Sequence, residues 1–273
     1  MSTLAVAKKD FLDVRRAKIV WFVSSLYLLL AVAMFYFGQN NAEEPEFRNA
    51  LQSLTGTGAL VLTLVALVTA YLAIAGERES GSIKYMLSIP NSRREVVLGK
   101  FLTRSGVVVA SILLGFGIGT ILGYLWYPSV DLELLLGTLA LTILFTLTYV
   151  SIAIGISAAT ASRSRAMGGT IAFFFVTTVL VLFGLVNTAL GWIFNDVLGR
   201  DLSGEVLTFI EALVSPMIAF SRAFNIFLAD LPEEAFQDQP WYLEGEMMIV
   251  ILLAWLVVPL ALGIWKFERA DLG

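Results

Sequence analysis

Long charge-free stretches alternate with short polar segments along the whole chain. Between charged residues lie six uncharged stretches of 19 to 30 residues, at 19–42, 49–76, 105–130, 134–162, 166–195 and 247–265. A membrane-spanning helix needs about 20 mostly apolar residues. The strands of a transmembrane barrel alternate in polarity instead, over segments of about 10 residues. The pattern therefore predicts an all-α, polytopic membrane protein with six transmembrane helices that form a single domain over residues 1–273.

Composition supports this prediction and excludes several classes of protein. Hydrophobic residues make up 58% of the 273 positions and charged residues 15%, against roughly 45–50% and about 25% in soluble domains. A soluble enzyme is therefore excluded. The chain contains neither cysteine nor histidine, so we expect no thiolate or imidazole metal site and no cofactor bound to this chain. The net charge of −4 gives no reason to expect nucleic acid as a partner.

The charges are distributed unequally between alternate polar segments. Fifteen of the 18 lysines and arginines, but only seven of the 22 acids, fall on the side that holds both termini. The positive-inside rule places that side in the cytoplasm, which predicts a multi-pass protein of the cell membrane with both termini cytoplasmic.

Residues 206–229 are apolar but contain Glu211, Pro216 and Arg222. A seventh span there would bury two charges, each at about 2.5–3.5 kcal/mol. We therefore expect residues 188–246 to be an extracellular or re-entrant segment. Ser215 followed by proline predicts the start of a short helix within it.

Apolar residues recur at helical spacing over residues 4–18, which predicts a short amphipathic helix. Such a helix can lie at the membrane interface with its cations towards lipid headgroups. A cytoplasmic extension of the first span fits the same periodicity. The residues assigned to this interface helix are Lys8, Lys9, Phe11 and Arg15.

The segment 76–104, after the second span, is too polar to cross a membrane. Pro90 predicts the end of a short helix over about 82–87, because proline removes a backbone donor. Ser92 and Glu95 fit a capping box, which predicts a second helix running from Arg93 into the third span. Two short helices in a cytoplasmic loop form a protrusion that another protein can bind. A basic loop that only touches lipid is the alternative.

This segment also resembles the sequence signature of ATP-binding-cassette (ABC) type 2 permeases. The matching positions are Glu77, Glu79, Gly81, Ser82, Met86, Leu87, Pro90, Ser92, Arg93, Gly99 and Lys100. Residues 7–11 also resemble the N-terminal helix of that family, with Asp10 where glutamate is commoner. The resemblance implies permeases of six spans that work in pairs with a second copy or a paralogue. It also implies docking on a cytoplasmic ATPase subunit through the N-terminal helix and the coupling helix in the loop after the second span.

The residues assigned to coupling and ATPase docking are Glu77, Arg78, Glu79, Gly81, Lys84, Pro90, Ser92, Arg93, Arg94 and Glu95. The chain has no phosphate-binding G-x-x-x-x-G-K-[ST] motif. We therefore expect no enzyme activity in this chain, with ATP and Mg²⁺ bound and ATP hydrolysed by the partner ATPase.

Two polar or small-residue patterns lie inside the predicted spans. Gly115, Gly119 and Gly123 recur every four residues, which favours close helix packing. The residues Thr138, Thr142, Thr146 and Tyr149 form a stripe that either lines a substrate route or bonds within and between helices.

Together these observations predict the permease subunit of an ATP-driven ABC transporter, an exporter by family expectation. A self-contained channel or secondary transporter is the first alternative, and a membrane anchoring protein without transport is the second.

Overall fold

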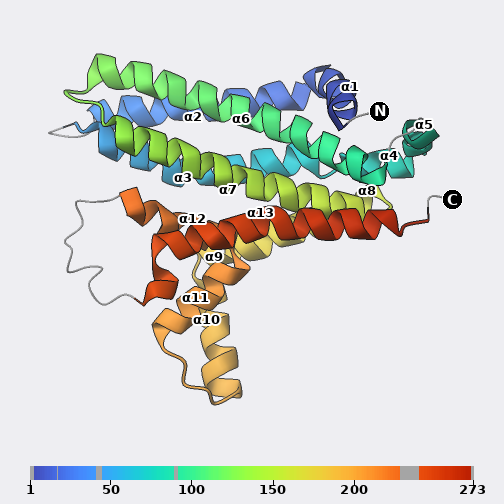
Figure 1. Cartoon of the computed structure of the whole chain (residues 1–273). Coiled ribbons are helices and arrows are strands. Elements are labelled where there is room, and N and C mark those ends of the chain that lie inside the picture. Colours follow the sequence, from blue (N-terminus) through green and yellow to red (C-terminus); the bar gives the residue numbers. More distant parts are fainter. Residues whose placement is uncertain (1–2, 17, 41–44, 89–91, 228–239, 272–273) are drawn as a thin grey trace. The chain divides into compact units, whose positions relative to one another are not determined.

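The computed structural model describes residues 3–16, 18–40, 45–88, 92–227 and 240–271, and all the regular elements among them are helices. The chain divides into two compact units. The first unit comprises Met1–Thr170 with Leu256–Gly273, and the second comprises Ile171–Trp255 (Figure 1). The all-α fold predicted from the sequence is confirmed.

The first unit is built around four long helices that lie side by side. They are α2 (Lys18–Asn40), α3 (Phe47–Ala70), α6 (Arg93–Trp126) and α7 (Leu132–Ala159). Shorter helices at one end of the unit are α1 (Thr3–Arg16), α4 (Ala75–Glu79) and α5 (Ser82–Ser88). The N-terminal interface helix predicted over residues 4–18 thus corresponds to α1, which is separate from α2.

The described residues contain five helical stretches that are long and apolar enough to cross a membrane, or six if one bent pair counts as a span. The five stretches are Phe47–Glu79, Arg93–Trp126, Leu132–Ala159, Arg163–Leu182 and Gly245–Glu268. In addition, α2 has 23 residues, of which only Lys18 is charged. At 1.5 Å per residue it is about 35 Å long, enough for a hydrocarbon core of about 30 Å. A polytopic membrane protein is confirmed.

Glycines on α6 bring this helix close to aromatic rings of its neighbours. A Cβ atom at Gly115 would lie 2.6 Å from the ring of Tyr27, and one at Gly119 would lie 2.7 Å from the ring of Phe35. Gly123 lies against a ring of α3 in the same way. Since real Cβ atoms essentially never approach so closely, larger side chains at these positions would separate α6 from α2 and α3.

The polar stripe on α7 lies in the packed core of the first unit. Thr138, Thr142, Thr146 and Tyr149 are each at most 1% exposed. The Thr146 hydroxyl donates to the backbone oxygen of Thr142 at 2.7 Å, within the same helix.

Between residues 163 and 197 the chain alternates between α-helical and π-helical segments. It runs through α8 (Arg163–Phe174), a π-helical turn at Phe175–Val179 and α9 (Leu180–Leu182), and continues in α10 (Leu185–Gly191) and a second π-helical segment, Trp192–Val197. Gly184 interrupts this path, because its φ of +68° is a left-handed conformation that glycine adopts at little cost. The charge-free stretch 166–195 is therefore not one continuous helix.

The second unit also contains the bent pair. Helices α11 (Gly204–Val214) and α12 (Pro216–Ala223) flank Ser215 with a bend of 115°. The Ser215 hydroxyl accepts from Ile218 N and donates to Thr177 O, and Pro216 is the first residue of α12. The helix start predicted at Ser215 is thus present, and the bend fits a broken span or a re-entrant loop.

After α12 come the 3₁₀ turns Phe224–Phe227 and Trp241–Leu243, and then α13 (Gly245–Glu268). Whether residues 188–246 are extracellular stays a prediction.

Candidate functional site

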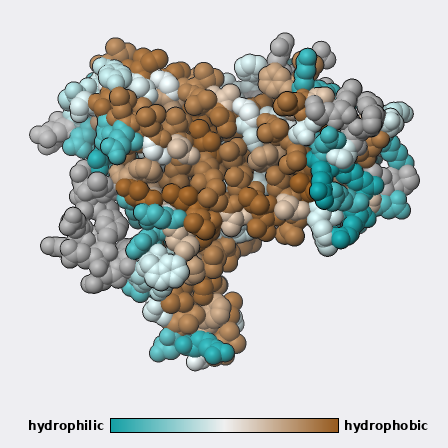
Figure 2. Space-filling model, in the orientation of Figure 1, coloured by the Kyte–Doolittle hydropathy of each residue, from teal (hydrophilic) through white to brown (hydrophobic). Residues whose placement is uncertain are grey.

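Hydrophilic side chains gather at the end of the first unit where α4 and α5 lie, whereas hydrophobic side chains cover the middle of the helices (Figure 2). We call this region the charged end, defined by residues 3–16, 75–88, 92–104 and 265–271. It contains all but one of the residues that the sequence assigned to docking. The exception is Pro90, which lies outside the described residues.

The local sequence explains the chain path between α4 and α6. Two backbone N–H groups at the start of α4, of Ile74 and Ala75, donate to the Ser157 hydroxyl of α7 at 3.0 Å each. Gly81, with φ of +75°, makes the turn from α4 into α5. The capping box predicted at the start of α6 is present, because Ser92 and Glu95 each accept a hydrogen bond from the other's backbone N–H.

Two arginines of the docking set bond to the carboxyl ends of transmembrane helices. Arg78 donates to the backbone oxygens of Ala158 and Thr160, at 3.2 and 2.9 Å, where α7 ends. Arg93 donates to three backbone oxygens where α13 ends, at 2.6 to 3.0 Å. Both guanidinium groups also lie over the buried ring of Phe267, at 5.7 and 5.6 Å from its centroid. Carbonyls in the last turn of a helix lack partners within that helix, and cations near them complement the helix dipole.

Two further residues of the set, Glu79 and Arg94, bond to partners far away in the sequence. Glu79 accepts a hydrogen bond from the backbone N–H of Arg163, the first residue of α8. An acid at a helix amino end is favourable for the same dipole reason. Arg94 and Glu268 form an ion pair on the exposed surface, which contributes little to stability in water.

A cluster of four charged side chains, of which Lys100 and Asp10 are buried, joins three helices of the charged end. Lys100, on α6, is 1% exposed, and its Nζ lies 3.1 Å from Asp10 Oδ1 on α1 and 2.8 Å from Glu77 Oε1 on α4. Arg104 also contacts Asp10 Oδ1, at 3.1 Å, and donates to Thr69 O at the end of α3. The carboxylate of Glu77, predicted for docking, is thus turned towards Lys100, with its side chain 25% exposed.

Sequence reasoning placed Lys100 among the positions that match the family signature and Asp10 in the family-like N-terminal helix, but it assigned none of Lys100, Asp10 and Arg104 to a site. A signal was present, because Lys100 and Arg104 are four residues apart and so share one face of a helix that continues into an apolar span. Their partners are 23 to 94 residues away in sequence, which no local pattern reveals.

The helix α5 has one buried face and one exposed face. Ile83 and Met86 are 1% and 5% exposed and hold it to the unit, whereas Tyr85 is 80% exposed and Lys84 is exposed beside it. An exposed tyrosine ring next to a lysine is typical of a contact surface, since tyrosine is enriched among the residues that dominate the binding energy of interfaces.

The helix α1 packs on α6 through small and apolar residues. Val6 and Val14 are buried, and a Cβ at Gly99 would lie 2.8 Å from Val6 Cβ and 2.9 Å from Thr3 O. The predicted lipid-facing residues Lys8, Lys9 and Phe11 are exposed. Arg15 is in the helix, and its side chain lies outside the described part of the structure.

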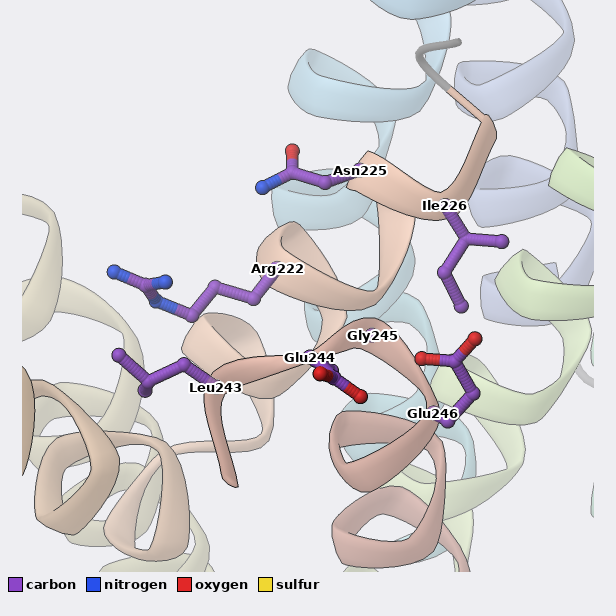
Figure 3. Close-up of a pocket in the computed structure, with 7 residues that line it drawn as sticks. All are labelled: Arg222, Asn225, Ile226, Leu243, Glu244, Gly245 and Glu246. Carbon is purple, nitrogen blue, oxygen red and sulfur yellow. The ribbon is translucent and has the colours of Figure 1, made fainter. Parts of the chain in front are cut away.

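A cavity of about 280 Å³ lies within the second unit (Figure 3). It is lined by Arg222, Asn225, Ile226, Leu243, Glu244, Gly245 and Glu246. These residues come from the end of α12 and the start of α13 with the turns beside them. None of them is among the predicted site residues, so the candidate functional site is the charged end.

Comparisons with known proteins agree with the resemblance seen in the docking segment. The model of a family described as ABC-2 family transporter protein matches residues 4–272. A probable ABC transporter permease protein NosY from Pseudomonas aeruginosa is 30% identical over 180 residues, which cover 63% of this chain and 66% of that protein. A protein of the same name from Stutzerimonas stutzeri is 29% identical over 133 residues, 48% of each chain. The chain thus spans less than two thirds of the length of either relative.

The family match extends over nearly the whole chain, including α1 and the charged end. Six apolar stretches and the capping box at Ser92 and Glu95 agree with this match, and the chain belongs to the ABC-2 family of transporter proteins.

Proposed function

We propose that the chain is the membrane-spanning permease subunit of an ATP-driven ABC transporter that works as an exporter. It couples ATP hydrolysis on a separate ATPase subunit to movement of a substrate across the membrane. The observation that carries this proposal is the match of the ABC-2 family over residues 4–272. Relatives named as probable ABC transporter permeases support it.

The ATPase subunit docks on α5. This helix is fixed to the unit by two buried side chains and directs Lys84 and Tyr85 outwards. Arg78, Glu79 and Arg93 bond to the ends of transmembrane helices. They therefore support docking indirectly, by fixing α7, α8 and α13 against the segment that carries α5.

The charged end faces the cytoplasm, with both termini on that side, as the excess of basic residues there favours. The exposed Lys8 and Lys9 of α1 contact the anionic headgroups of the inner leaflet. The transporter contains a second copy of this chain or a paralogue, and ATP with Mg²⁺ binds to the ATPase subunits.

Direct binding to the ATPase tests the proposal. The purified chain in lipid nanodiscs is titrated with its ABC ATPase subunit, and binding is followed by co-elution and by an optical biosensor. We expect saturable binding by the wild type and at least tenfold weaker binding by Lys84→Glu, because reversing an exposed charge at the contact repels the partner. The matched control is Lys18→Glu, which reverses a charge on an exposed residue of α2 outside the charged end and should bind as the wild type does.

Absence of binding by the wild type would overturn the proposal. So would substrate flux in liposomes that contain this chain alone, since a self-contained channel or secondary transporter needs no ATPase.

A further inference from the structure

The buried charges at the charged end are balanced and lie on three separate helices. Asp10, Glu77, Lys100 and Arg104 contribute two negative and two positive charges. Among the described residues, Lys100 contacts a carboxylate of α1 and a carboxylate of α4 at the same time. Both contacts are within hydrogen-bond distance, and the lysine side chain is 1% exposed.

Stability alone is a weak reason for such a cluster. Taking charges out of water is costly, and apolar residues of similar volume often stabilise a protein as well or better. Asp10 Oδ2, Glu77 Oε2 and Arg104 Nε are also buried without a hydrogen-bond partner, so the cluster leaves some polar atoms unsatisfied. The charges instead restrict the positions of α1 and α4 relative to α6. Lys100 keeps both hydrogen bonds only while the two carboxylates remain within about 3 Å of its Nζ.

The packing around the cluster makes α1 and α6 one body. Gly99 allows the backbone of α1 to approach α6 closely, and Thr103 donates to Ala7 O at 2.9 Å. Arg104, which is also on α6, forms an ion pair with Asp10 of α1. The α4 segment, which leads directly into α5, is joined to this body through Glu77 and Lys100.

We infer that Lys100 is a positioning residue that makes α1, α4 and α6 move together, so that displacement of α5 by the ATPase is passed to the interface helix and to the long helix α6. This inference rests on the proposed function. It assigns a role to a buried lysine and to its partners Asp10 and Glu77, none of which touches the ATPase or the substrate.

The test measures whether α1 and α4 keep a fixed separation during the ATPase cycle. The chain has no cysteine, so spin labels can be placed at Leu12→Cys on α1 and Ser80→Cys next to α4, both at exposed positions. Distances are recorded by double electron–electron resonance on the permease–ATPase complex in nanodiscs, without nucleotide and with a non-hydrolysable ATP analogue. ATP hydrolysis by the same complex is measured in parallel.

The main variant is Lys100→Met with Glu77→Gln. It removes one charge of each sign and leaves the Asp10–Arg104 pair in place, so no buried charge is left without a partner. In the unsubstituted background we expect the same narrow distance distribution in both nucleotide states. In the variant we expect the ATPase to bind and the distribution to broaden and change with nucleotide. We also expect the increase in ATP hydrolysis over the rate of the ATPase alone to fall at least tenfold.

A second variant keeps the inference testable if the Lys100→Met/Glu77→Gln variant does not fold. Asp10→Asn removes the negative charge at α1, which weakens its contacts with Lys100 and Arg104, and leaves Lys100 paired with Glu77. We expect the same broadening. Asp10→Glu keeps the charge and should restore the narrow distribution. Lys18→Met, the same substitution at an exposed lysine of α2 outside the charged end, should leave distances and ATP hydrolysis unchanged.

The outcomes separate the inference from the proposed function. Wild-type protein that neither binds nor stimulates the ATPase would overturn the proposed function. Normal stimulation together with unchanged distances in both the Lys100→Met/Glu77→Gln and the Asp10→Asn variants would overturn the inference and leave the proposed function standing. A labelled wild type whose α1–α4 distance changes with nucleotide would also overturn the inference.

Discussion

Arg93 shows how a single side chain connects elements at the charged end. Its guanidinium group donates to Phe267 O, Glu268 O and Ala270 O, 174 to 177 residues away in sequence. It belongs to α6, whereas its acceptors close the last helix of the chain. Arg93 therefore connects the carboxyl end of α13 to the start of α6.

Replacing Arg93 by alanine is expected to destabilise the protein. Three carbonyl oxygens lose a charged donor, and the loss amounts to about 2–3 kcal/mol, since one hydrogen bond to a charged group contributes about 1.5–3 kcal/mol and neighbouring bonds are not additive. Thermal unfolding of the detergent-purified protein, followed by tryptophan fluorescence, measures this. Lys84→Ala, at an exposed position, is the control, with a change within about 0.5 kcal/mol. Equal stability of the two variants would contradict the role given to Arg93.

Gly99 provides a second test at the residue scale. An added Cβ would meet Val6 Cβ at 2.8 Å and Thr3 O at 2.9 Å, and a backbone oxygen cannot move aside as a flexible side chain does. We expect Gly99→Ala to cost about 1–3 kcal/mol and to expose α1 to limited proteolysis. On the same helix, Gly106 has nothing within 4 Å of an added Cβ. Gly106→Ala should therefore be neutral or stabilise by up to about 1 kcal/mol, and the opposite order of the two variants would contradict the packing.

At the scale of elements, the two faces of α5 have different proposed roles: the buried face attaches the helix to the first unit, and the exposed face is the proposed contact with the ATPase. The buried residues of α5 attach it to the first unit, and its exposed residues are free of that task. Removing an exposed side chain from α5 should therefore change binding without changing the fold.

Tyr85→Ala is the variant that isolates this effect. We expect unchanged thermal unfolding and at least tenfold weaker binding of the ATPase, because an exposed tyrosine buried on docking is typical of residues that dominate interface energy. Tenfold corresponds to about 1.4 kcal/mol. The control is Tyr124→Ala at the other end of α6, where the ring is 62% exposed. Binding that is equally strong for Tyr85→Ala and Tyr124→Ala would argue against α5 as the contact.

What sequence reasoning predicted well are the features encoded locally. The capping box at Ser92 and Glu95 and the helix start at Ser215 were predicted from residues at most three positions apart, and both are present. The break at Gly184 was missed, because the uncharged stretch continues through it and a positive φ leaves no trace in hydropathy. The partners of Lys100 were missed for another reason: they come together only when three helices pack.

At the scale of the whole molecule, the distribution of charge predicts which side of the membrane the charged end faces. The charged end carries most of the basic residues, whereas 15 of the 22 acids fall in the alternate polar segments of the sequence. Positive residues stay on the cytoplasmic side during insertion. The charged end should therefore be inaccessible from outside the cell.

Single-cysteine labelling tests this orientation without interference, since the natural chain has no cysteine. We expect Glu133→Cys, at the start of α7, to react with a membrane-impermeant maleimide in intact cells. Ser88→Cys, at the end of α5, should react only after the membrane is permeabilised. Both positions are exposed, so differences in burial do not explain a difference in labelling. The reverse pattern would place the charged end outside and exclude docking of a cytoplasmic ATPase.

The central claim is that this permease receives its energy from an ATPase that binds α5. The most direct measurement is the rate of ATP hydrolysis by the ATPase subunit in proteoliposomes that contain the wild-type chain, the Lys84→Glu/Tyr85→Ala variant, or no permease. The account predicts a severalfold higher rate with the wild type than with the ATPase alone, and a return to the rate of the ATPase alone with the variant. Equal rates with the wild type and the variant, or no stimulation by the wild type, would contradict it.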